Sequence, residues 1–313
     1  MTNTFAQPVQ EVPRDRWGRP LVRDLDTGKL IPYRRATTFI DVLEDKFALN
    51  LWSQRMVATG LASRPDLLMK AAAAGGDKKE LNQVVEAARE AGGASQAATT
   101  GSALHSLTEQ LDRGQEPLIP PSAQLDIDAY TAATKHMTMR DIEVFVVDDQ
   151  RKVGGTFDRV VELDDVAYVA DLKTGKIDYG QSKIAMQLAV YAGSHRYDPA
   201  TGERSPLDVN QDRGLVIHLP AGAGECTLHW AALDQGREGL AIAEQVWAWR
   251  SRQGLLEATP PGPDLFGLID IAGDRESLKA LWLAHQDVWT DLHTAAVKRR
   301  LAALQTAPPA PAA

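Results

Sequence analysis

Apolar residues recur along this chain with two different periods. From Phe39 to Trp52 the spacing of three and four residues is that of a helix, with Thr37 or Thr38 as its N-cap. Further helical patterns are expected at about 78–91, at about 100–113 and within the Pro-marked stretch 119–139. The first half of the chain is therefore predicted to be helical.

The period then changes to that of strands. The stretches "DIEVFVVDD", "VGGTFDRVVEL" and "VAYVADLKT" are β-branched runs joined by short polar turns. A helix is expected next at about 179–196, followed by strands within 213–220 and 225–233 and a helix near 236–252. Strands that alternate with helices in this way predict an α/β domain, which we place at residues 36–255.

The remaining segments differ in pattern from this domain. Residues 1–35 predict an extended arm with a short hairpin around Asp26, Thr27 and Gly28. Residues 70–100 are Ala-rich and interrupted by two Gly pairs, which predicts a mobile helical insertion inside the domain.

The C-terminal part is predicted to be helical over 264–304, as one long amphipathic helix from Asp274 onward, before a disordered tail at 305–313. The apolar stripe that carries Trp282 and Trp289 is expected to pack on the rest of the protein, although docking of a partner would also explain it.

Composition narrows the classes of site. The chain has 313 residues and one cysteine, Cys226, so an internal disulfide, an iron–sulfur cluster and a cysteine-based zinc site are excluded. No run approaches the ~20 apolar residues of a membrane helix, and the first residues lack a signal-peptide core, so a cytoplasmic protein is expected. The net charge of −8 argues mildly against nucleic acid, but a carboxylate-lined metal site would also raise the acidic count.

Two aspartates stand inside apolar strands. Asp171 and Lys173 alternate onto one face near the end of their strand, an arrangement that alone could be a solvated ion pair. Asp158 lies on the preceding strand and can approach Asp171 across a hairpin, where two carboxylates repel unless a cation or proton separates them. Oxygen ligands of this kind suit Mg²⁺ or Mn²⁺. Gly154 and Gly155 indicate a bend just before Asp158, although a Gly-rich hairpin with exposed acids would look the same.

Other polar residues have ordinary explanations when each is taken alone. Gly101 and His105 lie one helical turn apart, and His105 by itself would more often be structural. Glu143 would be an edge charge on the first strand, and Gln187 and Tyr191 a polar stripe on the helix that follows the third.

Four motifs occur in order: Gly101 to His105 on a helix, Gly155 to Asp158 on a strand, Asp171 to Lys173 on the next strand, and Gln187 to Tyr191 on a helix. In this order the chain resembles the PD-(D/E)xK nuclease superfamily, specifically its RecB-like branch of phage and bacterial exonucleases. The resemblance covers about 100–193 and the first predicted helix. It implies a restriction-endonuclease-like core, with a central mixed sheet flanked by helices.

The resemblance also implies site roles. The implied ligands of Mg²⁺ or Mn²⁺ are His105, Asp158, Asp171 and the backbone carbonyl of Leu172. The implied catalytic residues are Asp158, Asp171, Lys173 and, in a supporting role, Glu143. Lys173 would position or activate the attacking water, and the sequence leaves both open; Gln187 and Tyr191 would orient the site and contact DNA.

A metal-dependent deoxyribonuclease is therefore expected, an exonuclease rather than an endonuclease, serving phage recombination, replication or repair in the cytoplasm of a bacterial host. Its implied partners are linear DNA with ends and a single-strand annealing or binding protein, with no membrane. The competing hypothesis is a catalytically inactive DNA-end-binding scaffold on the same fold.

Overall fold

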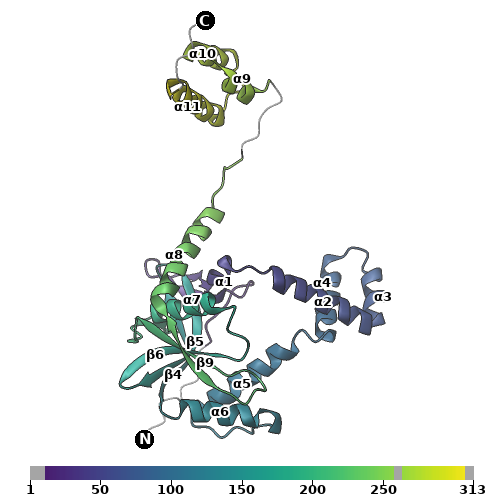
Figure 1. The fold of residues 1–313 in the computed structure, drawn as a ribbon, viewed down its shortest axis with the longest axis vertical. Coiled ribbons are helices and arrows are strands. Elements are labelled where there is room, and N and C mark those ends of the chain that lie inside the picture. Colours follow the sequence, from purple (N-terminus) through teal and green to yellow (C-terminus); the bar gives the residue numbers. More distant parts are fainter. Residues whose placement is uncertain (1–10, 257–262, 307–313) are drawn as a thin grey trace. The chain divides into compact units, whose positions relative to one another are not determined.

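The β-branched middle of the chain forms one mixed sheet, in the strand order β10-β9-β6-β5-β4-β7-β8 with the short β3 beside β5 (Figure 1). The computed structural model describes residues 11–256 and 263–306. The strands are β3 (Arg34–Arg35), β4 (Thr138–Asp148), β5 (Val153–Leu163), β6 (Val166–Lys173), β7 (His195–Tyr197), β8 (Arg204–Ser205), β9 (Arg213–His218) and β10 (Thr227–Ala232). Strands β4, β5 and β6 are antiparallel, whereas β6 and β9 are parallel.

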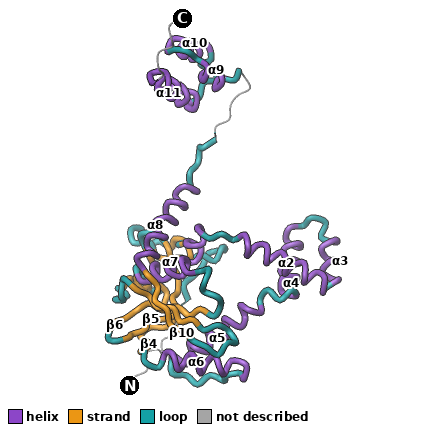
Figure 2. Tube along the Cα trace, viewed as in Figure 1, coloured by secondary structure: helices purple, strands orange, loops and turns teal. Residues whose placement is uncertain are grey.

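Helices cover both faces of the sheet (Figure 2). They are α1 (Ala36–Ile40), α5 (Gln96–Asp112), α6 (Gln124–Thr134), α7 (Gln181–Ala192) and α8 (Leu233–Arg250), with 3₁₀ turns η1 (Asp41–Leu43) and η2 (Pro121–Ala123). Helices α1, α7 and α8 share one apolar core with the sheet, for example through Leu188 and Leu240. Helix α5 and helix α6 share another, through Leu104 and Ile127. The expected α/β fold with helices flanking a central mixed sheet is confirmed.

The hairpin between β5 and β6 forms as the sequence predicts. Its turn residues Asp164 and Asp165 have φ of 51° and 61°, the left-handed backbone of a two-residue hairpin turn. Ladder pairs run from Leu163 and Val166 to Arg159 and Ala170.

The first predicted helix is wrong in its continuity and its cap. Helix α1 stops at Ile40 without a side-chain cap, η1 follows, and α2 (Phe47–Ser63) starts anew. The carboxylate of Asp45 accepts the backbone N–H of Phe47, which favours a fresh helix start there. Phe47 is 73% exposed, so the apolar residues at helical spacing do not all belong to one buried face.

Helices α2, α3 (Pro65–Ala73) and α4 (Lys78–Ala91) pack against one another around a small apolar core of their own. The helix at 78–91 is confirmed, with the Asp77 carboxylate as its N-cap. A Cβ at Gly60 would lie 1.7 Å from the Ala88 carbonyl oxygen, and one at Gly92 would lie 2.2 Å from the Met56 carbonyl oxygen. These glycines let α2 and α4 pack backbone to backbone. The mobility of the insertion stays a prediction.

The N-terminal hairpin is also confirmed. Strands β1 (Leu21–Arg23) and β2 (Leu30–Pro32) pair antiparallel, and Gly28 takes a φ of +67° in the turn between them. The expected arm begins with residues 1–10, which lie outside the described residues.

In the C-terminal unit, Arg250–Ala313, the residues that the structure describes after Arg250 form three helices: α9 (Leu265–Ile271), α10 (Arg275–Ala284) and α11 (Asp291–Thr306). The single long helix from Asp274 is therefore wrong. The break after Ala284 lets α11 turn back, so that Ala296 shares a small core with Ile269 and Leu278. Trp289 packs on this core, whereas Trp282 stays 45% exposed. The disordered tail expected from residue 305 onward is wrong for Gln305 and Thr306, which are the last residues of α11, and residues 307–313 lie outside the described residues.

Among the described residues, no helix is long and apolar enough to cross a membrane.

Candidate active site

Three carboxylates occupy matching positions on three neighbouring strands. Strand β4 pairs Ile142 with Arg159 and Val144 with Phe157, so Glu143 lies opposite Asp158. On the other side of β5, the ladder with β6 ends at Arg159 and Ala170, so Asp158 and Asp171 stand opposite each other just beyond its last pair. Glu143, Asp158 and Asp171, which we call the carboxylate row, thus cross the sheet side by side.

The strands are distorted where the row crosses them. Phe157 packs edge-on against Tyr191 of α7, but Arg159, two residues later, points to the opposite side and binds Asp112 of α5. Regular alternation would place both on one face, so it reverses at Asp158. On β4, Glu143 has a φ of +53°, a strained conformation for a residue with a side chain. Strained backbone of this kind clusters at functional sites.

The side chain of Asp158 replaces backbone pairing at the end of the β5–β6 ladder. Its Oδ2 accepts the backbone N–H of Leu172 at 2.8 Å, in place of further strand pairing. The Nδ1 of His105 lies 3.6 Å from the same Oδ2, too far for a hydrogen bond. Helix α5 approaches this edge closely because Gly101 meets Thr174, whose Oγ1 would lie 2.6 Å from an added Cβ. The spacing of Gly101 and His105 thus brings the imidazole to Asp158.

Asp171 is nearly fully buried and lies at the centre of a polar cluster. The Nε2 of Gln187 donates to its Oδ1 at 3.1 Å, and the Nζ of Lys173 lies 2.5 Å from its Oδ2. Lys173 also donates to Oε1 of Gln187 at 3.1 Å, and Nε2 of Gln187 lies 3.4 Å from the Tyr191 hydroxyl. Gly155 is needed beneath Tyr191, because an added Cβ would lie 2.9 Å from its ring.

Crowding and burial make this site electrostatically strained. Burial, followed by the charge of Asp158, raises the pKa of Glu143 to about 7. The same two causes raise the pKa of Asp171 to about 6, although the neighbouring Lys173 opposes them. Burial lowers the pKa of His105, while the charge of Asp158 acts in the opposite direction. Both carboxyl shifts indicate more negative charge than the protein itself neutralises.

The structure brings together all eight residues expected from the sequence. Seven converge through hydrogen bonds, ion pairs or the electrostatic effect of one charge on another: His105, Glu143, Asp158, Asp171, Lys173, Gln187 and Tyr191. Leu172 enters through its backbone, which bonds Asp158 and acts on the pKa of His105.

Sequence reasoning missed Arg159, which is buried directly behind the row. Its Nε bonds the Asp112 carboxylate at 2.5 Å, and its Nη2 donates to the Thr108 hydroxyl at 2.8 Å. Tyr130 donates to the same carboxylate. A charged residue inside the apolar run "FDRVVEL" was the available signal, because a fully buried arginine is rare unless it is paired.

The donors present suit a hard divalent cation, being carboxylates with one imidazole. Oδ2 of Asp171 is buried and accepts no hydrogen bond from the described residues, although the Lys173 ammonium lies beside it. Among the described residues, however, no three His, Cys, Asp or Glu side chains already stand in a ligating arrangement. The donor chemistry therefore fits a cation. The ammonium of Lys173 supplies part of the positive charge that such a cation would bring to Asp171.

No protein-family model matches the chain, and the comparison with curated proteins gives no match either. What the site does has to be argued from its own geometry.

Proposed function

We propose that this protein is a metal-dependent deoxyribonuclease whose active site is the carboxylate row. The observation that carries the proposal is that Glu143, Asp158 and Asp171 adjoin across three strands beside the ammonium of Lys173. Carboxylates grouped in this way can hold a divalent cation, and such a cation assists phosphodiester hydrolysis when a nearby side chain can take part in proton transfer.

Mg²⁺ or Mn²⁺ would be held by Asp158, Asp171 and His105, with the backbone carbonyl of Leu172 as a further oxygen donor. The raised pKa values of Glu143 and Asp171 support this assignment, because a divalent cation would offset the repulsion that raises them. When bound, such an ion supplies Lewis acidity toward a phosphoryl oxygen and lowers the pKa of a water molecule.

The protein's own residues would position the reactants. Gln187 fixes Lys173 and Asp171 together, so the Nζ of Lys173 is held where it can donate a hydrogen bond to the attacking water. The water oxygen forms a bond to phosphorus, the ester bond to the neighbouring nucleotide breaks, and the leaving oxygen takes up a proton from solvent water. Glu143, the carboxylate of the row that is not among the proposed metal ligands, is suited to accept the proton that the water loses.

The order of motifs, the mixed sheet and the row together support membership of the PD-(D/E)xK superfamily, in its RecB-like branch, with a restriction-endonuclease-like core. The substrate we propose is linear DNA, degraded from its ends, in phage recombination, replication or repair in a bacterial cytoplasm. A single-strand annealing or binding protein is the partner that such a role calls for.

Degradation of linear DNA with Mn²⁺ or Mg²⁺ tests the proposal. We expect wild-type activity that Lys173→Ala lowers at least about a hundredfold, as is common for residues that act on proton transfer. Lys176→Ala is the matched control, because Lys176 is exposed in the following loop and should keep full activity. Equal activity in all three proteins would contradict the assignment of the site.

The scaffold hypothesis remains a second candidate for one reason: Lys173 already stands against Asp171, and among the described residues no ready set of three ligands is present. Binding of DNA ends without hydrolysis in either metal would favour it.

A further inference from the structure

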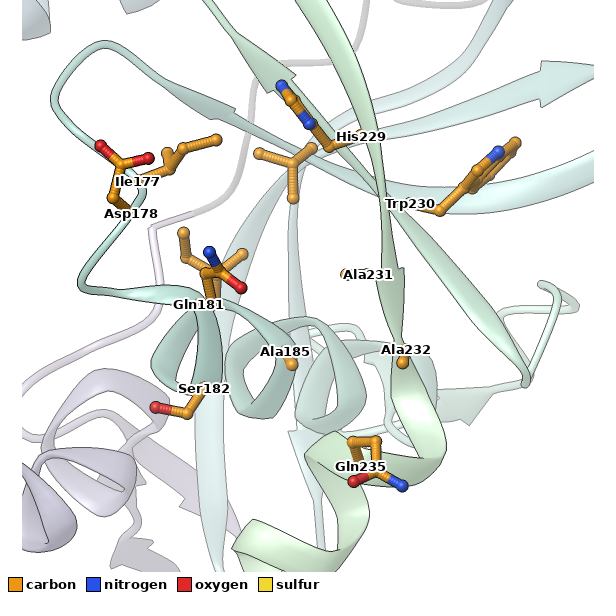
Figure 3. A pocket seen from close by; sticks show the side chains of 12 residues that line it. Ile177, Asp178, Gln181, Ser182, Ala185, His229, Trp230, Ala231, Ala232 and Gln235 are labelled. Atoms are coloured by element: carbon orange, nitrogen blue, oxygen red, sulfur yellow. The ribbon is translucent and has the colours of Figure 1, made fainter.

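A cavity lies one strand away from the carboxylate row. It has a volume of about 460 Å³ and is enclosed by β9, β10, the loop before α7, the first turns of α7 and the start of α8 (Figure 3). This volume is within the range of small-ligand sites in proteins, roughly 300–1,000 Å³.

The sheet register places the cavity in line with the carboxylate row. Asp171 of β6 pairs with Val216 of β9, and Val216 pairs with His229 of β10. Paired residues point to the same face, so these three side chains form one line across the sheet. Val216, His229 and Trp230 all belong to the lining of the cavity, although the indole of Trp230 alternates to the other side of β10 and leans away from the cavity (Figure 3). Two strand spacings, about 10 Å, separate Asp171 from His229.

Helix α7 contributes residues both to the candidate active site and to the cavity. Gln187 and Tyr191 form part of the site, while Gln181, Ile184 and Ala185, one to two turns earlier, line the cavity. A ligand in the cavity would therefore rest on the helix that fixes Lys173.

The lining suits a neutral ligand that has an apolar body and a polar edge. Ile184, Ala185 and Val216 give apolar walls. Gln181 and Gln235 contribute side-chain amides, each able both to donate and to accept, and neither makes a side-chain hydrogen bond to the described residues. A nucleobase presents this combination: apolar faces with donors and acceptors at its edge.

The charge of the lining disfavours a phosphate. Its described residues include the carboxylate of Asp178 but no lysine or arginine. Phosphate groups are usually bound by lysine, arginine or backbone N–H groups. The phosphodiester would instead lie toward Lys173, which leaves the base as the group that enters.

We propose that this cavity receives one unpaired base of the substrate strand, next to the phosphodiester that is hydrolysed. The inference rests on the proposed nuclease function and adds a substrate class to it, single-stranded DNA or a frayed end. The base has to be unpaired, because its edge meets Gln181 and Gln235 in place of a complementary base.

Binding can be measured apart from hydrolysis, with the full chain in EDTA. The probe is a fluorescently labelled DNA single strand of about twelve nucleotides, in which one abasic position is moved along the strand. Wild type should lose about tenfold in affinity when the missing base is the one for the cavity, and little elsewhere. The doubly substituted Gln181→Ala, Gln235→Ala protein and the cavity-filling Ala185→Phe protein should show no such position.

Gln83→Ala is the control, because Gln83 is an exposed glutamine of α4 outside the cavity and should keep the wild-type profile. A profile that is flat in wild type, or equally uneven in the double variant, overturns the proposal. Ala185→Phe could fail to fold, but the double variant replaces only exposed side chains and keeps the test decisive.

Hydrolysis with Mn²⁺ separates this inference from the proposed function. If both hold, the double variant raises KM about tenfold with kcat nearly unchanged. Hydrolysis with a flat abasic profile would leave the nuclease and remove the base site. An uneven profile that the double variant abolishes, without hydrolysis of any DNA, would keep the base site and remove the nuclease.

Discussion

Oδ2 of Asp158 accepts the backbone N–H of Leu172 at 2.8 Å, at the first position where β5 and β6 no longer pair. One carboxylate therefore ends the ladder and faces His105 at the same time. Substitutions of Asp158 can therefore distinguish the effect of its hydrogen bond on stability from the effect of its charge on activity.

Asp158→Asn should keep the fold and lose the activity. The amide oxygen of Asn can still accept the Leu172 N–H, but the charge toward His105 and Asp171 is gone. Asp158→Ala should lose the activity and also lower the stability, because an orphaned buried N–H costs about 1–3 kcal/mol. Thermal unfolding and DNA hydrolysis of both variants check this. A normal melting temperature for Asp158→Ala would show that the hydrogen bond does not support the hairpin.

Glu143 should make the metal-free protein less stable as the pH rises. Its pKa is raised to about 7, so the folded state holds this proton more tightly than the unfolded chain. Stability from the protonated form is fully present below about pH 4.5 and is lost as the pH passes 7. Glu143→Gln removes the titration and should stabilise the protein by about 1–3 kcal/mol at pH 8, but little at pH 4.5.

The measurement is denaturant unfolding in EDTA across this range. Asp171, with a pKa raised to about 6, contributes a slope of the same sign that remains in the variant. Parallel curves for wild type and Glu143→Gln would contradict the burial and crowding of Glu143.

Arg159 and Asp112 should be strongly coupled. Each is buried, and removing one leaves the other as an uncompensated charge, at about 3–5 kcal/mol. Arg159→Leu and Asp112→Leu should each destabilise by about this amount, whereas the double variant should lose much less than their sum. Denaturant unfolding of the four proteins measures the coupling. Additive losses would mean that the pair does not link β5 to α5.

Local pattern was enough to predict much of this fold. The β5–β6 hairpin, the helix at 78–91 and the face shared by Asp171 and Lys173 follow from periodicity, because each depends on neighbours along the chain. The helix predicted through Phe47 failed because helical spacing does not say where burial ends. The break between Ala284 and Asp291 lets α11 pack against α9, and the apolar periodicity within 274–304 does not indicate that contact.

The site divides in the same way. Motif order brought His105, Asp158 and Gln187 together, although they lie on three different elements. The reversal of alternation at Asp158 and the positive φ of Glu143 depend on three strands packing at once, so no window of sequence contains them. The cavity forms where α7, β9, β10 and α8 meet, so it depends on contacts between segments that are apart in the sequence.

The central claim is that the carboxylate row holds a divalent cation, and titration of the full metal-free chain with Mn²⁺ measures it most directly. We expect saturable binding in wild type that Asp171→Asn abolishes or weakens at least about tenfold, because even loss of a group that only hydrogen-bonds a metal ligand lowers metal affinity by about that much. Asp164→Asn, which alters an exposed carboxylate of the nearby hairpin turn, should bind as wild type does. Absence of saturable binding, or equal binding by wild type and Asp171→Asn, would contradict the account.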